Sequence, residues 1–252
     1  MKLSEFYNAL DSLAPRSLSA SWDNDGLMCK APAKDEVQKV LVSLDATAGA
    51  IAKAVDGGYD VLVTHHPMIF KGLKSITGED TVSSRAILAL SGGVSVISLH
   101  TRLDAADGGV NDALATSVGL PVSAKFGDSE TPELGRLCDI PETDADTLAL
   151  RVKNALGCSA VRVTGNGKIR KVAVVGGEGK DFIVPAIALG ADCLITGDAG
   201  YNASEAAAEG GFVIIEAGHY HTEVPVCENL AGYIRGLGIT ADVYNECPNR
   251  FI

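Results

Sequence analysis

The chain has 252 residues, which is enough for one large domain or two smaller ones with a core that needs no crosslinks. Its 46% hydrophobic content excludes a disordered chain, and its formal net charge of −11 argues against a nucleic-acid-binding surface or an anionic membrane partner. The six cysteines form no C-x-x-C pair, and the N-terminus lacks the apolar stretch of a signal peptide. No apolar run could span a bilayer, so we expect a cytoplasmic protein with reduced thiols.

Strand-like and helix-like segments alternate in the first half of the chain. After an amphipathic helix at the N-terminus, buried strands are expected over 37–46, 59–66 and 94–100. Helices are expected over 47–58, 83–93 and 108–119. The stretch from 121 to 143 is polar and carries three prolines, so we place a domain boundary there, between a first domain of residues 1–125 and a second of 126–252.

The second half repeats the alternation. Helices are expected over 145–157, 181–190, 202–211 and 223–238, the last with Thr222 as its N-cap, and strands over 159–165, 169–177, 191–198, 212–218 and 239–245. The pattern predicts an α/β fold of two domains, with mixed, largely parallel sheets covered by helices. The C-terminal helix and strand can pack back on the first domain.

All five histidines lie at or just after the carboxyl end of a predicted strand. His65 and His66 end one strand, His100 ends the next, and His219 and His221 follow a third. Asp104 and Glu223 lie a few residues further along. Because ligands bind at the carboxyl ends of strands in open α/β sheets, these segments are expected to converge in one crevice.

Imidazole and carboxylate together suit Zn, Fe, Mn, Co or Ni rather than the all-oxygen sites of calcium. Consecutive strand residues point to opposite faces, so His65 and His66 are poorly placed for one ion but can face two neighbouring ones. Asp104 and Glu223 could bridge such a pair, as in two-metal hydrolases. A lone histidine at a strand end is more often a hydrogen-bonding residue, and the prediction depends on three strand ends combining.

Six motifs, in order along nearly the whole chain, resemble one known family. They are "SWDNDGL", "VTHHPMIF", "SLHTRLDAADGGVNDALA", "VAVVGGEGKDFI", "ADCLITGD" and "EAGHYHTEVP". The family is that of the GTP cyclohydrolase 1 type 2 homologues, the NGG-interacting-factor-like dinuclear metal proteins. The chain matches the short form of the family, without an inserted central domain.

The resemblance implies two α/β domains with a dinuclear metal site in the cleft between them, and a toroidal homohexamer built as a trimer of dimers. Its motifs assign His65, His66, Asp104, His219 and Glu223 as ligands of two divalent metal ions per chain. His100 is left as a candidate catalytic acid or base. His221 stands at a variable position of the family and is left out of the ligand set.

Two positions depart from the family pattern. Arg102 stands where asparagine is usual, which brings a cation near the expected site, and Asn202 replaces a frequent histidine. Neither is among the five ligands. Trp22, Asp23 and Asn24 of "SWDN" belong to a family signature with no role that the sequence assigns.

The resemblance favours a metal-dependent hydrolase that acts through a metal-bridging hydroxide on a nucleotide-like or related small substrate. A non-catalytic metal-binding regulator, metal store or adaptor would need the same ligands and stays open. A third alternative is a phosphate loop at "VVGGEGKD", but its spacing departs from the Walker pattern and no Ser or Thr follows Lys180. A tight turn is the favoured interpretation of that stretch.

Overall fold

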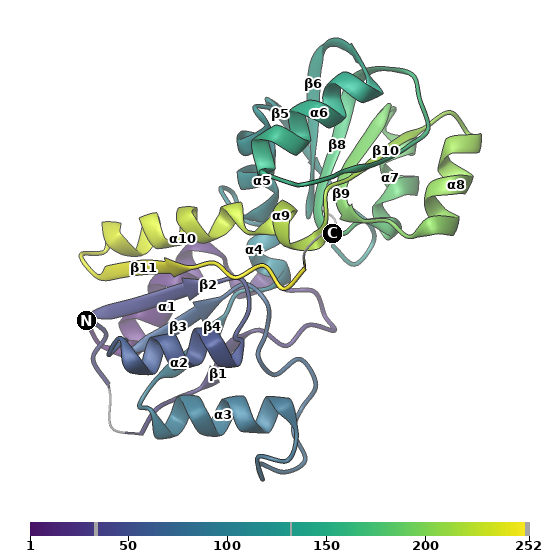
Figure 1. Ribbon diagram of the computed structural model, residues 1–252. Coiled ribbons are helices and arrows are strands. Elements are labelled where there is room, and N and C mark those ends of the chain that lie inside the picture. The colour runs from purple at the N-terminus through teal and green to yellow at the C-terminus, as the bar shows by residue number, and fades with distance from the viewer. Residues whose placement is uncertain (33–34, 132, 250–252) are drawn as a thin grey trace. The chain divides into compact units, whose positions relative to one another are not determined.

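A five-stranded sheet organises the first of two units in the computed structural model, which describes residues 1–32, 35–131 and 133–249 (Figure 1). This unit combines Met1–Ala106 with Cys227–Glu246, and the second unit comprises Asp107–Val226 with the residues from Cys247 on. The strand order of the first sheet is β1-β4-β3-β2-β11. Its strands are β1 (Gly26–Cys29), β2 (Lys39–Ser43), β3 (Val61–Thr64), β4 (Ser95–Ser98) and β11 (Thr240–Tyr244). All pairs are parallel except β1 with β4.

Helices cover this sheet because its central strands are apolar on both faces. Every residue of β3 and β4 is buried. Leu41, Leu62 and Val96 pack against small residues of α2 and α3, such as Ala54 and Ala86. The helical segments of the unit are α1 (Leu3–Leu13), η1 (Arg16–Leu18), α2 (Ala48–Asp56), α3 (Thr81–Ser91), α4 (Thr101–Ala105) and α10 (Pro225–Gly236).

A six-stranded mixed sheet with the order β5-β6-β8-β9-β10-β7 organises the second unit. β8, β9 and β10 are parallel, and the other pairs are antiparallel. The strands are β5 (Val122–Phe126), β6 (Gly135–Asp144), β7 (Arg162–Thr164), β8 (Lys168–Glu178), β9 (Cys193–Asp198) and β10 (Val213–Glu216). The helical segments are α5 (Val110–Val118), α6 (Ala145–Leu156), η2 (Lys180–Phe182), α7 (Ile183–Ala188), α8 (Tyr201–Glu209) and α9 (His219–Glu223).

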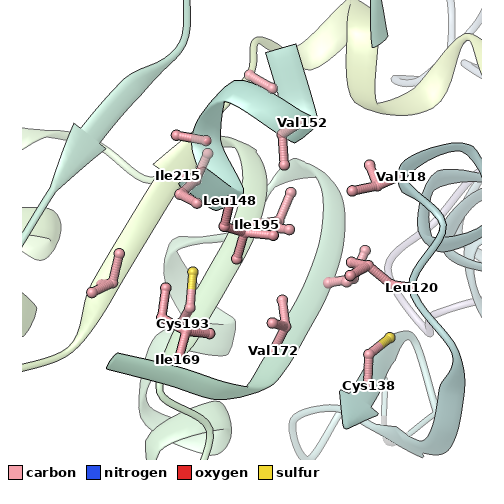
Figure 2. Packing of buried hydrophobic residues seen from close by; sticks show 14 of the residues in the cluster. Val118, Leu120, Cys138, Leu148, Val152, Ile169, Val172, Cys193, Ile195 and Ile215 are labelled. Atoms are coloured by element: carbon pink, nitrogen blue, oxygen red, sulfur yellow. The ribbon is translucent and has the colours of Figure 1, made fainter. Parts of the chain in front are cut away.

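Alternating residues of the central strands fill two cores, one on each face of this sheet. Val172 of β8 and Ile195 of β9 pack with Leu148 of α6 on one face (Figure 2). Ala173 and Leu194, one position away, pack on the other face with α7 and α8. Both faces are therefore buried.

The predicted fold, two α/β domains with mixed sheets, is confirmed. The polar stretch that suggested a boundary forms β5 and β6, which pair with each other and, through β6, with β8. The structure divides the chain earlier, after Ala106, because α5 packs on α6, β6 and β8. The C-terminal strand β11 pairs with β2 of the first sheet. Within the described residues every helix is too short or too polar to cross a membrane.

Two of the three leucines of α6, Leu148 and Leu150, provide a test of the core in Figure 2. Leu148 is 1% exposed, whereas Leu150 on the same helix is 59% exposed. We expect Leu148→Ala to lower the free energy of unfolding by about 2–5 kcal/mol, because it leaves a cavity. The matched control Leu150→Ala should change it by less than about 0.5 kcal/mol. Urea denaturation measures both, and equal losses would contradict this packing.

Candidate metal centre

Three adjacent parallel strands of the first unit end beside one another, and a polar residue follows each. Asp45 follows β2, His65 and His66 follow β3, and His100 follows β4. Backbone hydrogen bonds join the segments that follow these strands. The N–H of His66 donates to the carbonyl of Leu44 at 2.9 Å, and the N–H of Leu99 donates to the carbonyl of Thr64 at 2.8 Å. The strand ends therefore bring these side chains to one edge of the sheet, as the sequence predicts.

The three histidines form what we call the imidazole cluster, made up of His65, His66 and His100. One ring nitrogen from each lies within 4.8 Å of one from each of the others, a spacing that could hold a metal ion. The ring centroids of His65 and His66 are 4.8 Å apart, so these rings lie side by side rather than on opposite faces. Strict alternation does not apply to them because β3 ends at Thr64.

Each ring of the imidazole cluster is held through Nδ1 by an oxygen. Nδ1 of His65 lies 3.1 Å from the carbonyl of Leu99. Nδ1 of His66 and of His100 lie 2.9 Å and 2.8 Å from carboxylate oxygens of Asp45 and Asp23. A carbonyl or an ionised carboxylate only accepts, so Nδ1 is the donor in all three rings. That proton position gives Nε2 the lone pair, the arrangement found in metal-binding histidines with an oxygen partner.

Asp23 does more than orient His100. Its carboxylate also accepts from the backbone N–H of Thr101 at 3.1 Å and from the Thr101 hydroxyl at 2.6 Å. Burial raises the pKa of Asp23, but hydrogen bonds from His100 and Thr101 outweigh it and lower the pKa to about 2. Asp23 is therefore ionised at neutral pH, and it ties the "SWDN" loop to the start of α4.

Helix α4 carries the first carboxylate candidate, Asp104, which is 8% exposed. Its Oδ1 lies 3.7 Å from Nε2 of His65, so one acidic residue joins the imidazole cluster within the first unit. Arg102 on the same helix is fully buried, and its guanidinium donates to Asp11 at 2.6 Å and lies 3.3 Å from Asp25. Arg102 therefore lies on the same short helix as Asp104, and its charge is paired with these two carboxylates.

The second unit carries its own group, which we call the α9 group: His219, Glu223 and Asp198. Nε2 of His219 lies 3.1 Å from Oε2 of Glu223, its neighbour one helical turn along. Nδ1 of the same ring lies 3.6 Å from Asp198 at the end of β9. Glu223 is only 5% exposed on its side chain, whereas His219 is 42% exposed. Imidazole and carboxylate groups at this spacing are donor types that suit a divalent metal ion.

Glycines allow the backbone of the second unit to approach the α9 group closely. A Cβ on Gly177, whose φ is +64°, would overlap Oε1 of Glu223. A Cβ on Gly197 would lie 2.7 Å from Cα of His219. The "GGEGK" stretch is the irregular end of β8 against α9, and Lys180 pairs with Glu178 at 2.7 Å. Thr222, predicted as an N-cap, lies inside α9, where its hydroxyl accepts from the N–H of Gly177.

The structure brings His65, His66, His100 and Asp104 together in the first unit, and His219 and Glu223 in the second. Sequence reasoning did not find the role of two carboxylates. Asp45 follows a parallel strand just as the histidines do, and that signal could have revealed it. Asp23 lies on a loop with no comparable signal. Among the other residues considered, His221 rests edge-on against Tyr220, and Asn202 is exposed on α8.

Fold and donor groups together define an α/β protein with histidine and carboxylate clusters suited to divalent metal ions. Residues 1–245 match the sequence pattern of the family described as Duf34/NIF3 (NGG1p interacting factor 3). The chain belongs to the Duf34/NIF3 family, as its motifs suggested.

Curated relatives carry the name GTP cyclohydrolase 1 type 2 homolog. One from Clostridium perfringens is 32% identical over 237 residues, covering 90% of this chain and 88% of the relative. One from Streptomyces coelicolor is 35% identical over 240 residues, covering 90% and 83%. Among solved structures, a hypothetical protein of Staphylococcus aureus is similar with a TM-score of 0.90 and 25% identity, covering 100% of this chain and 99% of that one. Reduced HcgD of Methanocaldococcus jannaschii matches with a TM-score of 0.82 and 26% identity, covering 96% and 97%.

The close approach at Gly177 can be tested against a glycine that lacks it. Gly190 also has a positive φ, +72°, but a Cβ there would meet nothing within 4 Å. We expect Gly190→Ala to cost about 1–2 kcal/mol of unfolding free energy from backbone strain alone. Gly177→Ala should cost more, because Glu223 must also move. Urea denaturation compares the two variants, and a smaller loss for Gly177→Ala would contradict the role given to this glycine.

Proposed function

We propose that the protein is a dinuclear metal-dependent hydrolase. His65, His66 and Asp104 from the first unit and His219 and Glu223 from the second would together bind two divalent ions. Zn, Fe, Mn, Co and Ni all suit these ligands. The observation that carries the proposal is the set of Nδ1–oxygen contacts, which gives His65 and His66 the tautomer in which Nε2 can bind a metal.

The donor types support the assignment. Asp104 and Glu223 are both buried carboxylates, at 8% and 4% exposed, and each lies next to an imidazole nitrogen of its own unit. Imidazole and carboxylate together are the donors that divalent transition ions accept.

Two bound ions would lower the pKa of a water and stabilise negative charge that develops on a substrate oxygen. The chain supplies the orientation: Asp45 holds the ring of His66, and Leu99 holds the ring of His65. The name that the curated relatives carry, GTP cyclohydrolase 1 type 2 homolog, points to a nucleotide-like substrate, and we propose that class for this chain. By resemblance we also propose assembly as a homohexamer, a trimer of dimers, which sedimentation of the full chain tests.

His100 is proposed as the residue that moves a proton during hydrolysis. It lies within the imidazole cluster, and the ionised carboxylate of Asp23 holds its Nδ1. A carboxylate in that place stabilises the protonated imidazole, as a general acid or base requires. The ligand set above leaves Nε2 of His100 for the substrate.

Metal content tests the ligand assignment. Elemental analysis of the untagged protein should find about two divalent ions per chain. We expect His65→Ala or Glu223→Ala to lower this content while far-ultraviolet circular dichroism stays unchanged, because each removes one ligand and leaves the sheets intact. His221→Ala serves as the control. His221 lies between the proposed ligands His219 and Glu223 in the sequence but is not itself a proposed ligand, so this variant should keep both ions. Unchanged metal content in His65→Ala and Glu223→Ala would reject the site.

Turnover tests the hydrolase. The metal-loaded protein should be screened with GTP and other nucleotides, phosphoesters and cyclic amides. On whichever substrate is cleaved, His100→Gln should lower kcat by about 10²–10⁴-fold, the usual contribution of general acid–base catalysis, and should retain two ions. Loss of metal in this variant would instead make His100 a ligand. A loaded protein that cleaves nothing but alters the activity of a partner would favour the regulator.

A further inference from the structure

Three aromatic rings of the first unit meet edge to face beside the imidazole cluster. The ring centroids of Trp22 and Phe70 are 6.2 Å apart at an interplanar angle of 68°. His100 lies 6.3 Å from Trp22 at 76° and 6.1 Å from Phe70 at 86°. The same His100 ring is 5.4 Å from that of His65. Trp22 and Phe70 therefore form what we call the aromatic corner, which adjoins the imidazole cluster through His100.

Both members of this corner are unusually exposed. Trp22 is 55% exposed and Phe70 is 46% exposed, although large aromatic rings normally gain free energy by leaving water. Hydrogen bonds tie down the two loops that carry these rings. Nδ2 of Asn24 donates to the carbonyl of Ile69 at 2.5 Å, which joins the loop of Trp22 to the loop of Phe70. Asp23, between Trp22 and Asn24, is fastened to His100 and Thr101.

We propose that Trp22 and Phe70 bind the substrate by stacking on a planar heteroaromatic ring, such as a nucleobase. The proposal rests on the hydrolase function above and narrows its substrate class. Exposed, preorganised aromatic faces favour flat rings, because stacking gains contact area at little cost in conformational entropy. With the ring held on this corner, an attached group would reach His100 and the imidazole cluster. Asp23 and Asn24 act as positioning residues for the corner.

Trp22 is the only tryptophan of the chain, so its fluorescence reports on this corner directly. The full-length, metal-loaded protein is titrated with GMP, CMP and nicotinamide mononucleotide, and with ribose 5-phosphate as a control that has no planar ring. We expect at least one of the three nucleotides to quench Trp22 and to bind more tightly than ribose 5-phosphate. Ribose 5-phosphate can still meet the metals through its phosphate, so the difference isolates the ring.

Variants locate the stacking. Phe70→Ala should weaken binding of the quenching nucleotide by about tenfold, the scale of one base–aromatic stack, and Phe70→Tyr should restore it. Trp22→Ala, followed by equilibrium dialysis, should show a similar loss, and Trp22→Phe should recover most of it. Ile76→Ala is the control. Ile76 is another exposed apolar side chain of the segment after Phe70, at 57% exposed, and its removal should leave the nucleotide affinity unchanged. Metal content is measured in every variant and should stay at the wild-type value.

Quenching by none of the nucleotides, or equal quenching by ribose 5-phosphate, would overturn the stacking proposal. So would an unchanged affinity in Phe70→Ala and Trp22→Ala, or a change only in oligomeric size, which would make the corner a contact between copies. None of these results touches metal content or cleavage of phosphoesters, on which the hydrolase depends. Conversely, a protein that stacks nucleotides but binds no metal would refute the hydrolase and leave the aromatic corner standing.

Discussion

The contact between an imidazole Nδ1 and an oxygen at a neighbouring strand end is the interaction on which the first unit's chemistry depends. An imidazole that can turn or exchange its proton position is a poor ligand, because each metal-binding event must first select one rotamer and one tautomer. Here Leu99 and Asp45 hold His65 and His66, and each lies just after a strand that flanks β3. The sheet thus sets both the position and the protonation of its histidines.

In the second unit, close packing rather than a contact at Nδ1 holds the candidate ligands in position. Helix α9 has only five residues and could not hold His219 and Glu223 in place by its own backbone hydrogen bonds. Gly177 and Gly197 let β8 and β9 approach it to within van der Waals contact, and Thr222 joins α9 to the N–H of Gly177. The absence of a Cβ at Gly177 and Gly197 therefore allows the close packing that holds His219 and Glu223 in place.

Much of this arrangement can be predicted from the sequence, and the reasons for the rest are physical. Apolar runs that end in histidine predict both the parallel strands and the side of the sheet where His65, His66 and His100 gather. Asp45 shares the signal of the histidines, because it too follows a parallel strand, whereas the contact of Asp23 with His100 joins a loop to a distant strand end, which local periodicity does not encode. No local signal reveals the pairing of Arg102 with Asp11, because the two residues are far apart along the chain. The strands β5 and β6 escape prediction because both carry exposed polar residues and β6 also contains Pro141, and antiparallel strands need no continuous apolar run.

The pairing of β11 with β2 makes the first unit discontinuous along the chain, because Asp107–Val226, which hold all six strands of the second sheet, lie between its two segments. During synthesis on the ribosome, all strands of the second unit emerge before the first unit can acquire its last strand, β11. Until then β2 presents an unpaired edge with buried-type residues such as Val40 and Val42, the kind of edge that invites pairing with other chains. A nascent chain that stalls after residue 226 would carry all six strands of the second sheet and a first unit whose β2 edge is unpaired. We therefore expect premature termination to cause aggregation as well as loss of activity.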